Sequence, residues 1–173
     1  MATVYKNLSS YKKDSFSVDP ESVIGIVVSE WNENITNALA EGAISALIEN
    51  GIDKENIIVK YVPGTFELAV GARWLIDYTP VDAVLCLGCV IQGETRHFDF
   101  ICDAAANAIA KLGVDEGLPV IFGVLTTNTL EQAQDRAGGK HGNKGVEAAI
   151  TALKMISLSN SFDKTDFEEY NLN

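Results

Sequence analysis

The sequence predicts an α/β fold with three layers, αβα, built on a four-stranded parallel β-sheet. Apolar, β-branched runs alternate four times with amphipathic helical segments, and apart from Lys60 in the second run they are almost continuously apolar. Strand–helix cycles of this kind are joined by right-handed crossovers, which place helices on both faces of a sheet. Strands that are covered on both faces are apolar along their whole length, and these runs fit that description.

The first half of the chain supplies two strand–helix pairs. The first strand is predicted over residues 23–29 (VIGIVVS), and the helix that follows stops at Gly51, a residue typical of helix ends. The second strand is predicted over residues 57–62 (IIVKYV), and its helix over residues 65–78, with Pro80 beyond it. Apolar residues recur at helical spacing in the first helix, at Ile35, Leu39, Ala43 and Leu47.

The second half supplies two more strands. The third covers residues 83–89, and the amphipathic helix after it is predicted to end at Gly113. The fourth strand covers residues 120–125, and residues 129–132 (TLEQ) have the spacing of a capping box that begins a short helix. A glycine-rich stretch, 138–145, interrupts the chain before a last helix with a stripe of Val146, Ile150, Leu153 and Ile156.

Length and composition predict a single domain over residues 1–173. The hydrophobic fraction of 47% and the charged fraction of 21% are typical of globular proteins. Residues 1–21 form a polar N-terminal arm, and residues 159–173 form a polar C-terminal tail. The arm is long enough to extend the sheet of a neighbouring subunit by one strand.

Charge and cysteine content exclude several classes of protein. The net charge of −11 argues against a nucleic-acid partner, and no apolar run approaches the ~18–20 residues of a membrane span. The N-terminus lacks the apolar core of a secretory signal, so we expect a cytoplasmic location. Cys86 and Cys89 project to opposite faces of one strand, so neither a disulfide nor a shared metal is expected.

One stretch, residues 83–97, concentrates groups that suit an anion. It passes from a buried strand through Gly93 to a helix start at His97, with Arg96 just before it. A helix start directs backbone N–H groups and a positive dipole end at one point, which suits phosphate. His97 is one of only two histidines and can transfer protons near neutral pH. Because ligands of parallel sheets bind beyond the carboxyl ends of the strands, this end of the sheet is the predicted site.

Three familiar motifs are missing from the sequence. It contains no G-x-x-x-x-G-K-[ST], no G-x-G-x-x-G after the first strand and no G-x-S-x-G. With two histidines, a metal cluster is poorly supported. The residues therefore favour acid–base chemistry on a small molecule that carries a phosphate.

The predicted strand ends also carry a set of motifs. They are SEWN at 29–32, PGTFE at 63–67, GCVIQGETRHFDFI at 88–101, FGVLTTNTLEQAQDRAGG at 122–139 and KHGNKG at 140–145. In this order and spacing they resemble the 6,7-dimethyl-8-ribityllumazine synthase family, from about residue 23 to residue 158. GET-x-HFD followed by DRAGGK-x-GNKG is the most specific part.

The resemblance implies a flavodoxin-like fold and a transferase of riboflavin biosynthesis. The family joins 5-amino-6-(D-ribitylamino)uracil to 3,4-dihydroxy-2-butanone 4-phosphate. The amine attacks the ketone, an imine forms, phosphate is eliminated and the ring closes with loss of a second water. The resemblance implies small-molecule substrates and no metal or organic cofactor.

The same resemblance assigns the groups around the phosphate. It implies that His97 is the proton donor and that Arg136 binds the phosphate together with Glu94 and Thr95. Lys140 and Lys144 are further candidates, and with Arg96 and Arg136 they are expected to surround one point. Apart from the family context, His97 can be a packed helix start, Arg136 a solvated charge and the lysines part of a solvated turn.

The resemblance also assigns the groups around the heterocycle. Trp31, where the family usually has phenylalanine, would stack on the pyrimidine, and Phe122 would reach it from a neighbouring subunit. Taken alone, Trp31 fits a core equally well, Phe122 is better explained as a core residue, and Thr65 fits a helix N-cap. The remaining implied contacts to the pyrimidine and ribityl chain are the turn Thr65, Phe66 and Glu67, the main chain of Cys89, Val90 and Ile91, and Asn32 as a possible addition.

The family resemblance further implies a homo-oligomer with active sites between subunits. Family members form pentamers, and the compact turn AGGKHGNKG favours assembly of twelve pentamers into an icosahedral capsid. Three alternatives stay open from the residues: a flavodoxin-like module that binds flavin or lumazine without turnover, a shell protein whose activity has decayed, and a riboflavin synthase of the archaeal type.

Overall fold

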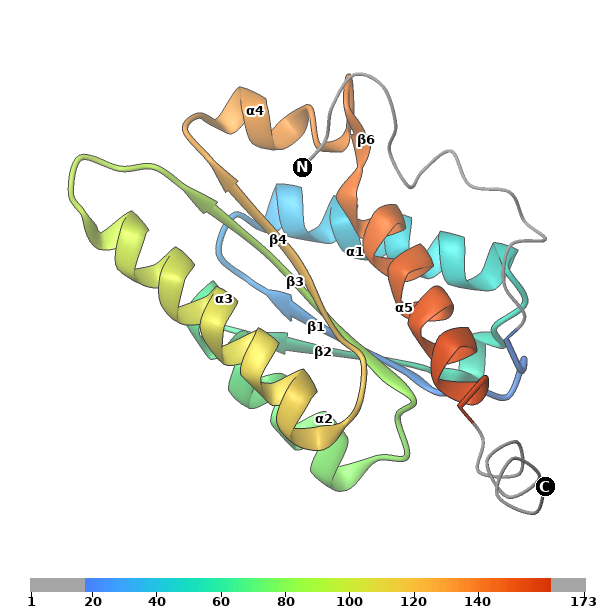
Figure 1. Cartoon of the computed structure of the whole chain (residues 1–173). Helices are drawn as coiled ribbons and strands as arrows, with labels where there is room; N and C mark the ends of the chain where they lie inside the picture. The colour runs from blue at the N-terminus through green and yellow to red at the C-terminus, as the bar shows by residue number, and fades with distance from the viewer. Residues whose placement is uncertain (1–17, 163–173) are drawn as a thin grey trace, which may run out of the picture.

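The computed structural model describes residues 18–162 and contains a four-stranded parallel sheet in the order β2-β1-β3-β4. Its strands are β1 (Ile24–Ser29), β2 (Ile57–Val62), β3 (Ala83–Ile91) and β4 (Val120–Thr127). Figure 1 shows that all four run in the same direction across the molecule, as their pairing requires. The predicted three-layer, flavodoxin-like fold is therefore confirmed.

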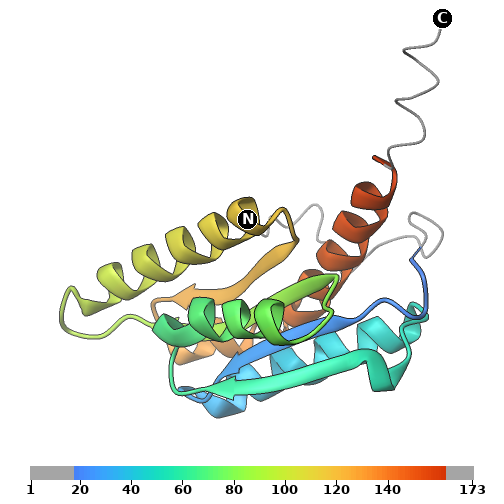
Figure 2. The ribbon, with the colours of Figure 1, turned by 90° about the horizontal axis from the view of Figure 1, so that it is seen from below.

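Helices cover both faces of this sheet (Figures 1 and 2). On one face, α1 (Glu33–Glu49) and α5 (Lys144–Asn160) pack against β1 and β3, and on the other face lie α2 (Leu68–Tyr78) and α3 (His97–Glu116). Shorter elements connect them: the 3-10 turns η2 (Lys54–Asn56) and η3 (Thr65–Glu67), the helix α4 (Leu130–Gln134), and a small hairpin of β5 (Ala137–Gly139) with β6 (Gly142–Asn143). No described helix is both long enough and apolar enough to cross a membrane.

The core divides into two layers because strand residues alternate between faces. Leu85 and Cys89 join the cluster under α1 and α5, whereas Val84 and Cys86 join the cluster under α2 and α3. Cys86 and Cys89 therefore point to opposite faces, as the sequence predicts, and all three cysteines are free. Every residue of β1 is buried, in keeping with a central strand.

Several predicted boundaries were wrong, each for a local reason. The third helix continues through Gly113 to Glu116, because Gly117 adopts the left-handed conformation (φ 61°) and the N–H of Leu118 donates to the Gly113 carbonyl at 3.2 Å. The strands β3 and β4 each extend two residues further, since Val90–Ile91 pairs with Thr126–Thr127.

The ends of the chain and the glycine-rich stretch also differ from expectation. The final helix continues to Asn160, so the predicted tail begins inside it, and residues 163–173 lie outside the described part. The glycine-rich stretch forms most of the β5–β6 hairpin, which the sequence did not indicate. Thr129 is confirmed as the N-cap, since its hydroxyl accepts from Gln132 N at 3.2 Å, but the Gln132 side chain accepts from Asn128 N at 2.9 Å instead of completing the capping box at Thr129 N. The strand expected from the N-terminal arm falls mainly on residues 1–17, which are not described.

The start of α5 is fastened to α1 by close backbone packing. The Asn143 side chain accepts hydrogen bonds from the N–H groups of Gly145 and Val146 and donates to the Ala38 carbonyl at 2.8 Å. A Cβ atom at Gly145 would lie 1.9 Å from the Leu39 carbonyl oxygen, so only glycine fits there. This contact fixes the hairpin and α5 against α1.

We predict that Gly145→Ala destabilises the protein by about 3 kcal/mol or more, because the clash is with backbone that cannot rotate away. Gly93→Ala is the matched control, since a Cβ there meets nothing within 4 Å. Urea unfolding of both variants measures the difference. Equal midpoints for the two variants would contradict the packing described here.

Candidate active site

The first candidate site is a cavity of about 630 Å³ at the carboxyl ends of β1 and β3. Figure 1 shows the long loop between β3 and α3 projecting beyond the sheet at this end. Parallel strands bring the segments after β1, β2 and β3 to the same edge, as the sequence predicts. Ten predicted site residues line the cavity: Trp31, Asn32, Thr65, Phe66, Glu67, Cys89, Val90, Ile91, Thr95 and His97.

Two exposed aromatic side chains belong to this lining. Trp31 is 75% exposed and Phe66 is 59% exposed, so neither is a core residue in the single chain. Large aromatic surfaces in a concave site are suited to stacking on a planar ring. The interpretation of Trp31 as core is therefore wrong for this chain.

Asn32 connects two walls of the cavity. It adopts the left-handed conformation (φ 61°), the only described non-glycine residue with positive φ, and its Nδ2 donates to the Cys89 carbonyl at 2.9 Å. Asparagine tolerates this conformation better than most residues. The bond fixes the start of α1 against the end of β3.

His97 occupies the first position of α3, where the helix start borders the cavity. Its side chain is exposed, and its backbone N–H donates to the Thr95 hydroxyl at 3.4 Å. Arg96 forms an ion pair with Asp99 at 3.4 Å and does not line the cavity. Glu94 is exposed and also outside the lining, whereas its neighbours Gly93 and Thr95 are part of it.

The Thr65 hydroxyl does not act as predicted. It makes no N-cap hydrogen bond, and the residue is only 4% exposed, although it lines the cavity. Its oxygen is fully buried and has no hydrogen-bond partner. The expectation that this residue caps the helix is therefore wrong.

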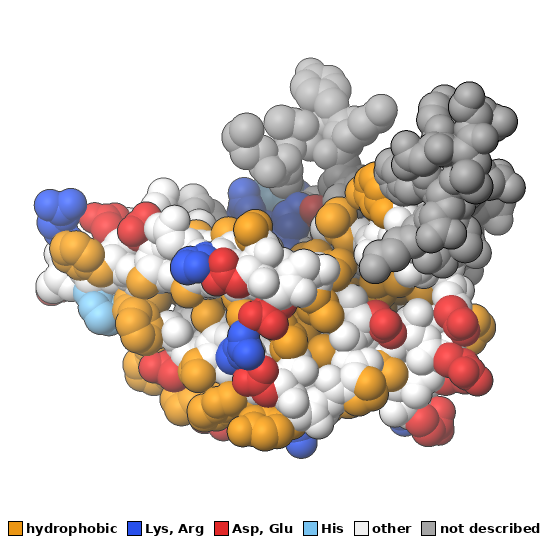
Figure 3. Space-filling model, turned by 60° about the horizontal axis from the view of Figure 1, so that its bottom comes forward, with side chains coloured by type: hydrophobic (Ala, Val, Ile, Leu, Met, Phe, Trp, Pro, Cys, Tyr) orange, Lys and Arg blue, Asp and Glu red, His pale blue; other side chains and the backbone are white. Residues whose placement is uncertain are grey.

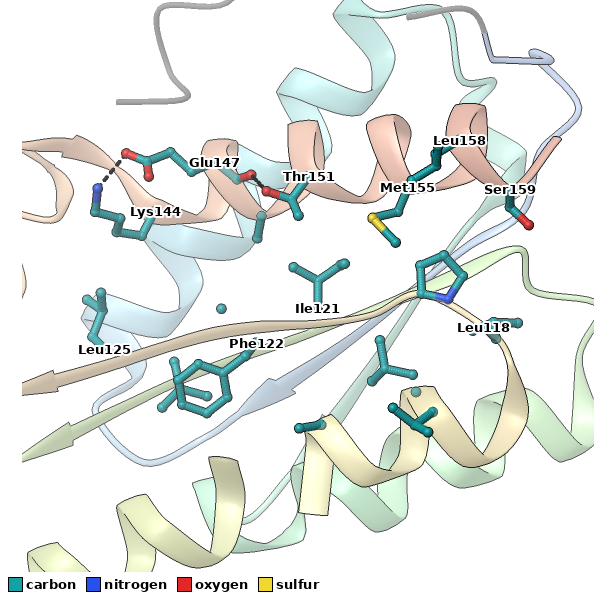
Figure 4. A pocket seen from close by; sticks show the side chains of 18 of the residues that line it. Leu118, Ile121, Phe122, Leu125, Lys144, Glu147, Thr151, Met155, Leu158 and Ser159 are labelled. Carbon is teal, nitrogen blue, oxygen red and sulfur yellow. Dashed lines mark hydrogen bonds and ion pairs between the residues drawn. The ribbon is translucent and has the colours of Figure 1, made fainter. Parts of the chain in front are cut away.

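A second cavity, of about 920 Å³, lies along β4 between α3 and α5. Figure 4 shows Ile121 and Met155 facing each other across it, and Phe122 on the side of β4 nearer α3. β4 is an edge strand, so no strand of the described chain pairs with its outer side. Three further site residues line this second cavity: Phe122, Arg136 and Lys144.

The hairpin brings two cations to one end of the second cavity. The N–H of Lys144 donates to the Arg136 carbonyl at 2.9 Å, and Arg136 Nη1 donates to the Gln132 carbonyl at 2.9 Å. Lys144 Nζ also pairs with Glu147 at 2.5 Å, a contact drawn in Figure 4. Both partners of that pair are less than one-fifth exposed, so the contact is well shielded from solvent.

Within one chain the candidate residues therefore divide between two cavities. Four basic side chains were expected around a single point, but only Arg136 and Lys144 share a cavity. Arg96 lies beside the first cavity, and Lys140 is exposed on the hairpin outside both linings. The expectation is wrong for the isolated chain, because α3 and the hairpin are separate elements.

Part of each lining was not predicted from the sequence. Phe98 and Ile101 line the first cavity one turn apart on α3. Glu147 and Thr151 line the second on α5, joined by a hydrogen bond of 2.7 Å from the Thr151 hydroxyl to the Glu147 carbonyl. The spacing of three between Lys144 and Glu147 was the one signal that could have indicated their pairing.

Large hydrophobic side chains are exposed on the helices α2 and α3. Figure 3 shows such side chains gathered over this face between charged groups. On α2 they are Val70, Trp74 and Tyr78, and on α3 they are Phe100 and Val114. Contiguous exposed apolar surface of this kind is typical of protein–protein contacts.

Comparison with known proteins gives a consistent result. The family model described as 6,7-dimethyl-8-ribityllumazine synthase matches residues 21–160. A protein of that name from Cytophaga hutchinsonii is 60% identical over 157 residues, covering 91% of this chain and 98% of the relative. Others of the same name are 55% identical, from Porphyromonas gingivalis (91% and 98% covered), and 52% identical, from Parabacteroides distasonis (92% and 99% covered).

Burial raises the pKa of the Cys89 thiol to about 11 and that of Cys86 to about 12, against about 9 for a solvated thiol. In the unfolded chain these thiols lose their protons near pH 9, whereas in the folded protein they keep them. We therefore predict that the free energy of unfolding falls as the pH rises above about 9. Urea unfolding at pH 7.5, 9 and 10 measures this loss. A Cys86→Ala/Cys89→Ala variant should lose less of its free energy of unfolding over the same pH range. If it loses the same amount, other titratable groups cause the effect.

Proposed function

The chain belongs to the 6,7-dimethyl-8-ribityllumazine synthase family, and we propose that its two cavities are complementary halves of an active site completed between adjacent subunits. It is a transferase of riboflavin biosynthesis that forms 6,7-dimethyl-8-ribityllumazine. In one chain His97 lines the first cavity and Arg136 lines the second. This separation is the observation that supports a shared site. A reaction that needs both groups must then draw them from two copies.

The first cavity is proposed to hold 5-amino-6-(D-ribitylamino)uracil. The exposed indole of Trp31 offers a face for the pyrimidine, and stacking on a base is worth ~1–3 kcal/mol. Cys89, Val90 and Ile91 line the same space, and their main-chain groups are proposed to contact the polar edge of the ring. The Glu67 carboxylate belongs to η3 and can accept hydrogen bonds from ribityl hydroxyl groups.

The second cavity is proposed to supply the phosphate end from a neighbouring subunit. Arg136 presents a planar guanidinium that fits phosphate with two parallel hydrogen bonds, and Lys144 adds a second positive charge. Phe122, which is 42% exposed, would cover the pyrimidine from the same subunit. The start of α3, with Thr95, completes the phosphate contacts from the first cavity. For Glu94, whose carboxylate would repel a phosphate, only the main-chain N–H is proposed as a contact.

The distribution of charge supports this division. The chain as a whole is strongly acidic, with a net charge of −11, yet two cations meet at the end of the second cavity. Lys144 is held there by Glu147, and Arg136 by the Gln132 carbonyl, so both are ordered before any anion arrives. An anion is thus drawn to one small region of a protein that repels it elsewhere.

His97 is proposed as the proton-transfer group. The amine of the pyrimidine attacks the ketone of 3,4-dihydroxy-2-butanone 4-phosphate, and water leaves to give an imine. Phosphate is then eliminated, and attack of the ribityl-bearing nitrogen closes the ring with loss of a second water. Protons must be delivered to the leaving oxygens and removed from carbon, and an accessible imidazole at the cavity mouth suits both tasks.

Assembly into pentamers, and of pentamers into an icosahedral capsid, is part of the proposal. The unpaired side of β4 and the exposed apolar residues of α2 and α3 are surfaces that a neighbouring copy can bury. The compact β5–β6 hairpin keeps the region before α5 short. A cytoplasmic location is also proposed, because free thiols such as the three here persist in reducing compartments.

The function is tested by mixing both substrates and following lumazine fluorescence together with phosphate release. We expect product and phosphate in equal amounts from the unaltered chain. His97→Ala should lower kcat by ~10²–10⁴-fold with pyrimidine affinity nearly unchanged, because only proton transfer is lost. Lumazine binding without phosphate release would favour the non-catalytic alternative, and an unchanged kcat would remove His97 from the mechanism.

Arg136→Ala should weaken binding of the phosphate substrate selectively, by ~2–5 kcal/mol, as expected when a buried charge pair is truncated. Mixing His97→Ala subunits with Arg136→Ala subunits should then restore activity. In an equal random mixture, about one quarter of the interfaces combine an intact His97 with an intact Arg136. Activity is measured before and after co-assembly, with the mass in solution measured in parallel. A mixture no more active than either variant would mean that both groups act within one chain.

A further inference from the structure

Two buried hydroxyl groups beneath the first cavity have no hydrogen-bond partner. Ser29, the last residue of β1, is 0% exposed, and Thr65, the first residue of η3, is 4% exposed. Their oxygens are the only buried side-chain nitrogen or oxygen atoms of residues 18–162 that lack a partner. Both residues lie at the carboxyl-terminal end of the sheet, next to the cavity that Thr65 lines.

The two hydroxyl groups converge on one spot beside β3. A Cβ atom built at Gly88 would lie 2.9 Å from Thr65 Oγ1 and 3.3 Å from Ser29 Oγ. The same position is 2.9 Å from Leu68 Cδ1, so the third close neighbour is apolar. Because Gly88 has no side chain, the two oxygens approach the same open position from two different elements.

Leaving both groups unpaired would cost free energy, since a buried hydroxyl without a partner loses its hydrogen bonds to water. Each hydroxyl has one donor and two acceptor positions, so two hydroxyl groups that face one spot can satisfy each other directly after side-chain rotation or through one ordered water. The three heavy atoms nearest the Gly88 position are these two oxygens and the Leu68 methyl carbon. Ser29 is therefore the natural partner of Thr65.

We propose that Ser29 is a positioning residue for the first cavity. Its hydroxyl hydrogen-bonds to Thr65, directly or through one water, and so fixes the turn η3 that carries Phe66 and Glu67. Those two side chains line the cavity where the polyol-bearing pyrimidine is proposed to bind, so the inference rests on the proposed function. Ser29 itself is fully buried and does not line the cavity.

Ser29→Ala tests this inference, because it removes one oxygen and leaves the packing of the strand unchanged. We expect KM for the pyrimidine substrate to rise roughly three- to tenfold, the loss of one hydrogen bond, with kcat and KM for the phosphate substrate nearly unchanged. Ser22→Ala is the matched control, since Ser22 is also buried (7% exposed) but lies before the amino end of the same strand. It should leave both KM values unchanged.

A double-mutant cycle with Thr65→Val tests whether Ser29 acts through Thr65. Valine keeps the shape of threonine and removes the hydroxyl, so Ser29→Ala should have no further effect in that background. Additive effects on KM, or equal changes in KM for the two substrates, would overturn the inference. If Ser29→Ala does not fold, Ser29→Cys replaces it, since it keeps a side chain at the position but forms a weaker hydrogen bond.

The two proposals fail in different ways. Normal product formation by the unaltered chain and by Ser22→Ala, with an unchanged KM in Ser29→Ala, would overturn only the role of Ser29. Absence of product from the unaltered chain would overturn the proposed function and this inference with it.

Discussion

The uncovered edge of β4 is the constraint on which the rest of the molecule depends. The sheet order β2-β1-β3-β4 places this strand last, and an apolar cavity lies along it between α3 and α5. A strand edge of this kind, next to exposed Phe122 and Met155, is costly to leave in water. Arg136 and Lys144 line the cavity along this edge, so a neighbouring copy that covered the edge would also meet the two cations proposed to bind phosphate. In the proposed assembly, burial of this edge and completion of the site therefore depend on the same contact.

Most of the fold could be predicted from the sequence because its strands are covered on both faces. A short run dominated by apolar and β-branched residues, such as residues 23–29, is typical of a strand in such a sheet, and the buried strand Ile24–Ser29 was found there. Helix ends were harder, because Gly113 and Gly117 are both plausible stops and only the bond from Leu118 decides between them. The hairpin at residues 137–143 has too few side chains to carry a pattern, so it became visible only in three dimensions.

The candidate site was predictable in part for a similar reason. Parallel topology alone brings Trp31, Thr65 and His97 to one edge of the sheet, and these residues do line one cavity. No periodicity or spacing could connect them with Phe122 or Arg136, which reach the site in the proposal only from another copy. Nor could the sequence reveal that the Thr65 hydroxyl turns inward, because its orientation depends on the space above Gly88.

The hydrogen bond from Asn32 to the Cys89 carbonyl has one more consequence. It ties the segment after β1 to the segment after β3 without any ligand, so two walls of the first cavity are already preorganised. A planar molecule entering there would not have to order those walls, and less conformational entropy would be lost on association. The left-handed conformation of Asn32 carries a little backbone strain, which this preorganised arrangement requires. Asparagine is among the few residues that tolerate the left-handed conformation.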